Sequence, residues 1–165
     1  MFIAALLPDD VLDLLASLPR PQEPGVRYTR RDQWHVTLRF LGSCEIDAAR
    51  EAFDRIDASA ATGALGPAVS RLGRSVVVVP IAGLEPLAAS VAAVTAAVGE
   101  PPDPRPFTGH VTVARLKGRP ACRIAGHPVR ASFAVRELHL VRSDTHADGA
   151  VYQTVAATTL RRQSS

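Results

Sequence analysis

The sequence contains one short pattern twice: His-Val-Thr followed by an aliphatic residue. The two copies begin at His35 and His110, and both stand in apolar, β-branched stretches that are typical of strands. Alternate side chains of a strand point to the same face. Each copy is therefore expected to present one imidazole and one hydroxyl together, His35 with Thr37 and His110 with Thr112.

Two such pairs facing each other would form a site with two proton-transfer groups and two neutral hydrogen-bond donors. Imidazole titrates near neutral pH, so one ring can accept a proton while the other donates one. The hydroxyls can bind the non-bridging oxygens of a phosphate. A single His-x-Thr pair is more often a structural or surface feature of a strand, but two copies in matching contexts favour hydrolysis of a phosphodiester without a metal.

The surroundings of the two copies match as well. An apolar strand begins at Phe2 and another at Val76, at nearly the same distance before each histidine. Between strand and histidine, each half carries a helix-like segment, 9–18 in the first and 84–98 in the second. The spacing predicts an internal repeat whose two motifs lie across one cleft. We therefore expect a single domain over 1–165, with a seam between two lobes near 61–67.

Other elements follow from local patterns. Residues 46–60 predict an amphipathic helix, and 63–67 predict a turn. Residues 132–141 and 150–160 predict an antiparallel pair of strands joined through 143–149. The last residues, 161–165, are expected to form a frayed tail.

Composition indicates a folded protein with a modest basic excess. The chain has 165 residues, 47% of them hydrophobic and 21% charged, with a formal net charge of +3. Of its 19 basic residues all but Lys117 are arginine, whose planar fork suits phosphate oxygens. This fits a nucleic-acid or nucleotide partner. Arg27, Arg30 and Arg31 stand close to the first motif, either as RNA contacts or as a solvated edge.

The sequence offers no metal site or membrane anchor. Cys44 and Cys122 are isolated, so neither zinc-type spacing nor a disulfide framework is present. The apolar opening is short, lacks a basic start and is followed by Pro8, unlike a signal peptide. No run approaches the roughly 20 apolar residues that span a bilayer. We expect a cytoplasmic monomer that needs no metal or other cofactor.

Three segments make a family resemblance specific. They are MFIAALLP (1–8), WHVTLRFLG (34–42) and FTGHVTVAR (107–115). In these segments the chain resembles the 2H phosphoesterases, and most closely their RNA 2′,3′-cyclic phosphodiesterase branch, historically called the 2′-5′ RNA ligase family. The resemblance covers nearly the whole chain. Gly109 departs from it, because the family commonly has proline before the second histidine.

The resemblance implies a bilobal α+β fold of the 2H phosphoesterase type. Two pseudo-twofold-related lobes with antiparallel-rich sheets would form a central groove, with the motif strands placed centrally and helices outside. It also assigns His35 and His110 as catalytic residues, and Thr37, Thr112 and Arg115 as the groups that bind the substrate phosphate. Side chains alternate along a strand, and Arg115 is five residues after His110, so the two lie on opposite strand faces. Arg115 would therefore need a bulge or a strand end to reach the groove.

Other residues with chemical capability have simpler interpretations. His127 precedes a proline in a loop, and His139 alternates with leucines in a strand. His146 lies in an acidic turn without a second cluster of ligands, which is weak support for a metal. Arg105, in a proline-rich loop, could meet substrate or simply face solvent.

The expected reaction is metal-independent hydrolysis of RNA 2′,3′-cyclic phosphate ends to 2′-phosphate ends. Between the two possible assignments we take His110 as base and His35 as acid. Relatives of this fold also act on small molecules, so a cyclic phosphodiesterase for ADP-ribose cyclic phosphate or 2′-5′ oligoadenylate is one alternative. An RNA-binding module without turnover and a 2′-5′ RNA ligase are the others. The paired histidines argue against a pure binder, and no nucleotidylation lysine motif is visible.

Overall fold

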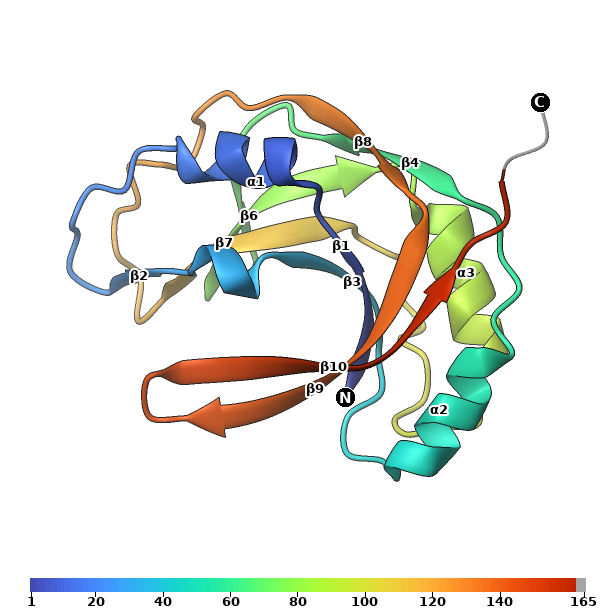
Figure 1. Cartoon of the computed structure of the whole chain (residues 1–165). Helices are drawn as coiled ribbons and strands as arrows, with labels where there is room; N and C mark the ends of the chain where they lie inside the picture. Colours follow the sequence, from blue (N-terminus) through green and yellow to red (C-terminus); the bar gives the residue numbers. More distant parts are fainter. Residues whose placement is uncertain (163–165) are drawn as a thin grey trace.

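The two His-Val-Thr motifs lie on strands of different antiparallel sheets (Figure 1). The computed structural model describes residues 1–162. The four-stranded sheet has the order β10-β9-β1-β3 and consists of β1 (Phe2–Leu6), β3 (His35–Phe40), β9 (Glu137–His146) and β10 (Gly149–Thr159). The six-stranded sheet has the order β2-β7-β6-β4-β8, with β5 pairing to β6. Its strands are β2 (Val26–Tyr28), β4 (Ala61–Leu65), β5 (Ser70–Leu72), β6 (Val76–Ala82), β7 (His110–Leu116) and β8 (Ala131–Val135).

The repeat predicted from the sequence is present in the strand pairing. In each half the first strand pairs with the strand of the histidine, β1 with β3 and β6 with β7. The registers correspond residue by residue, because Phe2 and Val76 begin their strands at equivalent points. The matching pairs are Leu6–His35 with Pro80–His110, and Ala4–Thr37 with Val78–Thr112.

The placement of the motif strands differs from the expectation. β3 is the edge strand of its sheet rather than a central strand, and β7 lies second from the edge, covered by the short β2. β3 and β7 lie against each other where the two sheets meet. This arrangement still brings the two motifs together, since the junction of the sheets lies between them.

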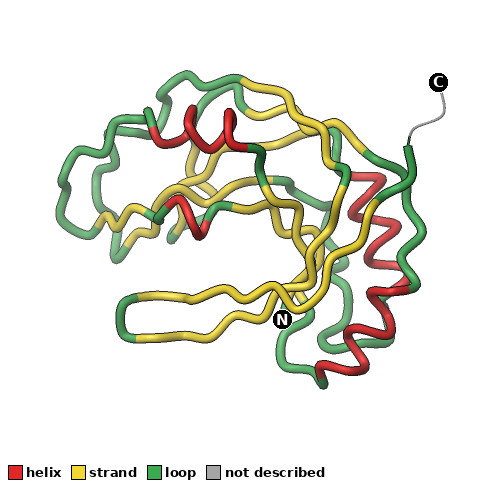
Figure 2. Tube along the Cα trace, in the orientation of Figure 1, coloured by secondary structure: helices red, strands yellow, loops and turns green. Residues whose placement is uncertain are grey.

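Within residues 1–162, three α-helices and one short 3₁₀ helix connect the strands (Figure 2). They are α1 (Asp9–Ala16), η1 (Arg31–Gln33), α2 (Ile46–Asp54) and α3 (Glu85–Val94). Each α-helix falls within a predicted helical segment but ends earlier. Acidic residues occupy the first turn of each α-helix, where they favour the positive end of the helix dipole. None of these helices within residues 1–162 is long and apolar enough to cross a membrane.

Strand β1 separates two apolar clusters. Ile3 and Ala5 are fully buried and belong to the main core, which also includes the fully buried Phe53 of α2. Phe2 and Ala4 point the other way and pack in a small second cluster with Val141 of β9. The alternation of side chains along one strand thus supplies both the core of the protein and the floor beneath the histidines.

Several predicted elements need correction. The expected turn at 63–67 is in part strand β4, where Gly63 leaves room for the ring of Phe133: a Cβ at Gly63 would lie 2.8 Å from it. The expected strand 132–141 is divided at Arg136 between β8 and β9, which belong to different sheets. The predicted antiparallel pairing of the C-terminal strands is confirmed for β9 and β10.

The C-terminal tail is partly ordered. Arg161 bridges to Ser59, and its guanidinium pairs with Asp57 at 2.7 Å. The expectation of fraying is therefore wrong at this residue, because both its backbone and its side chain are held. The rest of that prediction, at 163–165, lies outside the described residues.

Candidate active site

The two histidines line one cleft of about 390 Å³ between the sheets. His35 and Thr37 project into it from β3, and His110 and Thr112 project from β7. All four side chains are neither fully buried nor fully exposed, while Val36 and Val111 between them are completely buried. The period of two that the sequence predicts for each motif is therefore present.

Both imidazoles are held in the same way. Nδ1 of His35 lies 2.8 Å from the carbonyl oxygen of Gln33, and Nδ1 of His110 lies 2.8 Å from that of Thr108. A carbonyl oxygen only accepts, so Nδ1 carries the hydrogen in both rings. In the neutral form Nε2 is then the basic nitrogen. Nε2 of His35 accepts from Oγ1 of Thr37 at 3.0 Å.

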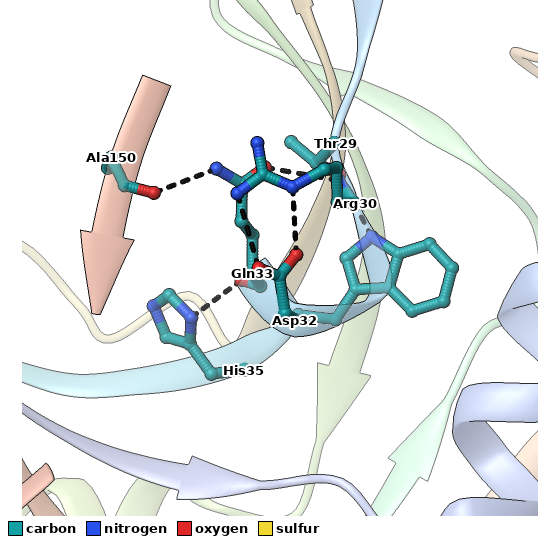
Figure 3. Close-up of polar contacts among 7 residues, drawn as sticks. Thr29, Arg30, Asp32, Gln33, His35 and Ala150 are labelled. Carbon is teal, nitrogen blue, oxygen red and sulfur yellow. Dashed lines mark hydrogen bonds and ion pairs between the residues drawn. The ribbon is translucent and has the colours of Figure 1, made fainter. Parts of the chain in front are cut away.

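Figure 3 shows how the loop before β3 supports His35. Gln33 closes η1, and its carbonyl faces the imidazole while its side-chain amide donates to the carbonyl of Ala150 at 3.1 Å. Its amide oxygen accepts from the backbone N–H of Arg30. Gln33 therefore connects the first histidine with the tip of the β9–β10 hairpin, which forms the opposite wall of the cleft.

Two aromatic rings pack on the imidazole of His35 and exclude water from it. Phe2 stacks on the imidazole, and Tyr152 of β10 meets it edge-on with ring centroids 5.1 Å apart. Burial is the main reason why the pKa of His35 is lowered. The bond to the Gln33 carbonyl opposes this shift, and the charges of His110 and Arg115 add to it. The structure thus favours the neutral ring at His35.

A β-bulge brings Arg115 into the cleft. The pairing of β6 and β7 shifts between Val77 and Val78, so that Val113 is passed over and Arg115 emerges on the face of His110. The bulge that Arg115 needs in order to share a face with His110 is therefore present, and Arg115 lines the cleft.

The first half contains the same bulge. The pairing of β1 and β3 shifts between Ile3 and Ala4, and it brings Phe40 into the cleft five residues after His35. Phe40 is 55% exposed, which is unusual for a large apolar side chain in a strand. The internal repeat therefore places an arginine at one end of the cleft and an exposed aromatic ring at the equivalent position in the other half.

Of the other candidate residues, some line the cleft and others do not. Arg27 and Arg30 line the cleft, whereas Arg31 pairs with Asp13 at 2.6 Å and does not. Arg105 pairs with Asp103 at 2.6 Å, also away from the cleft. His139 pairs with Glu137 at 2.8 Å on β9 and does not line the cleft either.

Neither loop histidine nor cysteine joins the site. His127 and His146 are exposed and lie outside the cleft. Cys44 and Cys122 are free thiols elsewhere in the structure. Within residues 1–162 no cluster of three or more His, Cys, Asp or Glu side chains could hold a metal ion.

Sequence reasoning missed several residues around His35, namely Phe2, Gln33 and Tyr152. Tyr152 and Gln33 belong to segments that meet only through tertiary pairing, so no local pattern indicates them. Phe40 could have been found from the repeat, since it occupies the same place after His35 as Arg115 does after His110.

Comparison with known proteins shows what this arrangement resembles. The sequence model of the LigT-like phosphoesterases matches residues 5–65, which include the first motif. A protein from Thermus thermophilus, solved as a crystal structure, is 27% identical in sequence and superposes with a TM-score of 0.77, over 99% of this chain and 98% of that one. The chain is therefore similar to the LigT-like phosphoesterases, and it has the 2H phosphoesterase fold.

Two further solved structures are similar over nearly the whole of both chains. A crystal structure of a phosphoesterase is 26% identical with a TM-score of 0.79, and 97% of each chain is covered. Escherichia coli LigT, solved in complex with 3′-AMP, is 25% identical with a TM-score of 0.75, and 96% of each chain is covered. Among curated proteins, none matches the sequence significantly.

Proposed function

We propose that this protein is a phosphodiesterase of the LigT-like type that hydrolyses RNA 2′,3′-cyclic phosphate ends to 2′-phosphate ends. The observation that carries the proposal is the matched pair of histidines. Each is held through Nδ1 by a carbonyl two residues earlier, and both line one cleft. Two imidazoles fixed in the same tautomer at one cleft can supply a base and an acid without a metal.

The two rings have different surroundings, and this suggests their roles. Burial against Phe2 and Tyr152 lowers the pKa of His35, which keeps the ring neutral and able to accept a proton. We assign His35 as the general base and His110 as the general acid. This reverses the assignment made from the sequence. His35 takes the proton of the attacking water as its oxygen bonds to phosphorus. The bond from phosphorus to O3′ then breaks, and His110 donates its proton to O3′.

Neutral and charged donors stabilise the phosphate in this scheme. Thr37 and Thr112 donate from their hydroxyls to non-bridging oxygens, and Arg115 supplies positive charge from the same face. Donors fixed before the reaction stabilise charge that develops in the transition state. The hydroxyl of Thr37, which bonds to His35 here, turns to the phosphate when substrate is bound.

The cleft also offers features that suit a nucleotide. The exposed ring of Phe40 can stack with a base, a contact that tolerates different bases. Every residue named in this scheme belongs to one chain, so we propose that the monomer is the acting unit. Both cysteines are free, which fits a reducing compartment, and we propose a cytoplasmic location.

Side-by-side turnover tests this function against its alternatives. We expect a cyclic-phosphate oligonucleotide to be hydrolysed with a higher kcat/KM than ADP-ribose cyclic phosphate or 2′-5′ oligoadenylate. A higher kcat/KM for either small molecule would move the assignment to that substrate. Binding without turnover would indicate an RNA-binding module. Net joining of RNA ends would indicate a ligase.

A further inference from the structure

Two arginines lie next to each other at one end of the cleft. Arg27 of β2 pairs directly with Arg115 of β7, and both line the cleft that contains the histidines. Residues directly opposite on antiparallel strands have side chains on the same face. Like charges in this arrangement destabilise a strand pair. An arrangement that costs stability and faces a cleft is suited to an anionic ligand.

In the part of the chain that the structure describes, these two groups have no carboxylate partner. Among residues 1–162, neither Arg27 nor Arg115 has an ion-pair partner within 4.0 Å. The neighbouring Arg30 differs, because it pairs with Asp32 at 3.0 Å. Asp148 at the hairpin tip also lines the cleft, and its charge acts on Arg30. The charges of Arg27 and Arg115 therefore remain available to a ligand.

The two arginines lie at different distances from the histidines. Arg115 shares strand β7 with His110, and its charge contributes to the lowered pKa of His35. Arg27 lies one strand further out, on the edge strand β2, and neighbouring strands are about 4.8 Å apart. Arg115 is thus placed for the reacting phosphate, and Arg27 for a group beyond it.

The hairpin tip leaves room beside Arg27. A Cβ added to Gly149 would lie 3.7 Å from Nη1 of Arg27, so the glycine brings the backbone of the tip close to the guanidinium without a side chain between them. Asp148 and Ala150 of the tip line the same cleft as Arg27 and Arg115. This end of the cleft therefore extends beyond Arg115 to Arg27.

We propose that Arg27 binds the phosphodiester that precedes the cyclic phosphate, so that the protein prefers an oligonucleotide end to a free cyclic mononucleotide. The proposal rests on the function assigned above. A planar guanidinium matches two phosphate oxygens. An RNA strand carries such a phosphate one nucleotide before its end, whereas a cyclic mononucleotide has none.

Direct binding tests this role separately from turnover. The ligands are two dinucleotides with a 2′-phosphate end, one joined by a normal phosphodiester and the other by an uncharged methylphosphonate. We expect the protein to bind the phosphodiester roughly 2–5-fold more tightly, as for a partly exposed charge pair. Arg27→Gln should bind both equally. It should also reduce the slope of log K against log salt by about 0.7, the value for one phosphate contact on a single strand.

Arg31→Gln provides a matched control. Arg31 stands near Arg27 in the sequence, but it is paired with Asp13 and does not line the cleft. This variant should keep the preference for the phosphodiester. Circular dichroism would verify that both variants fold, which is expected because Arg27 and Arg31 are exposed.

Three results would overturn the proposal. One is a wild-type protein that does not distinguish the two linkages, and another is an Arg27→Gln variant that keeps the full preference. The third is a mononucleotide with 2′- and 5′-phosphates that binds as tightly as the phosphodiester-linked dinucleotide and depends on Arg27 to the same extent. This would show a subsite for a terminal phosphate rather than for an RNA linkage. Hydrolysis of a cyclic-phosphate oligonucleotide, measured in parallel, decides the proposed function independently.

Discussion

The ring of Phe2 stacks on the imidazole of His35, with the centroids 4.7 Å apart and the planes inclined by 20°. Tyr152 meets Phe2 edge-on as well, so the three rings form one cluster. This cluster couples packing to chemistry. The same contacts that complete the floor of the cleft exclude water from the histidine, and this loss of water lowers its pKa.

The pH dependence of catalysis should reflect this cluster. A general base must be neutral, so the rate falls as pH drops through its pKa. Because the pKa of His35 is lowered, the acid limb of kcat/KM should lie below the ordinary histidine value of 6.5. Tyr152→Ala should admit water to the ring and move this limb upward, towards 6.5. A pH–rate profile of both proteins measures the shift.

Phe40→Leu is a control for that profile. Phe40 also lines the cleft, but it is not among the rings that pack on His35. The Phe40→Leu variant should change substrate affinity and leave the acid limb of the pH–rate profile in place. An acid limb at or above 6.5 in the wild type, or one that Tyr152→Ala leaves unmoved, would remove the base role from His35.

Loss of either histidine should abolish most turnover. General acid or base transfer contributes about 10²–10⁴-fold to a rate. We expect losses of this size for His35→Ala and for His110→Ala. The double variant should be little worse than either single one, because the two rings act as a unit. His127→Ala, at an exposed loop histidine, is the control. Near-normal activity in one single variant would contradict the two-histidine scheme.

The threonines should matter less than the histidines. Thr37→Val and Thr112→Val each remove one donor to the phosphate, for which we expect a loss of roughly 10–10³-fold by analogy with an oxyanion donor. Valine keeps the β-branched shape, so folding should be largely spared. Steady-state kinetics would show the effect. If both variants turn over substrate with wild-type kcat and KM, the hydroxyls serve only the strand.

The hairpin contact of Gln33 can be broken without changing His35 or His110. Gln33→Met removes the bonds to the Ala150 carbonyl and to the Arg30 N–H, each worth about 0.5–1.5 kcal/mol. The backbone carbonyl that holds His35 remains. We expect faster amide exchange at residues 147–151 and a higher KM, with kcat nearly retained.

Gln153→Met is the matched control for the hairpin. Gln153 lies on the same hairpin in β10 and is exposed. This variant should leave exchange at the tip unchanged. Equal exchange in Gln33→Met and wild type would mean that the contact does not hold the hairpin.

Local patterns predicted which side chains share a face on the two motif strands, because that depends on a period of two. Once His35 and His110 are placed on strands, Thr37 and Thr112 must share their faces. The equivalent pairings of β1 with β3 and of β6 with β7 follow from the matched spacing. The α+β fold class and the C-terminal hairpin were also correctly predicted, since antiparallel strands joined by a short turn depend on neighbouring sequence.

Non-local pairing could not be predicted in the same way. Periodicity indicates which face of β3 is buried, but not that β3 lies at the edge of its sheet. The glycines at 63 and 66 suggested a turn, whereas Gly63 lies in a strand beneath Phe133, a contact far apart in sequence. A bulge adds one residue without a distinctive local signal, so the presence of Arg115 in the cleft depended on the register with β6.

The most direct test is to identify the product end after incubation of an oligonucleotide 2′,3′-cyclic phosphate with the protein in excess EDTA. The scheme uses only side chains of this chain, so hydrolysis should proceed at the rate seen without chelator. The product should carry a 2′-phosphate, because His110 donates its proton to O3′. Loss of turnover in EDTA that zinc or manganese restores, or a product with a 3′-phosphate, would contradict the scheme.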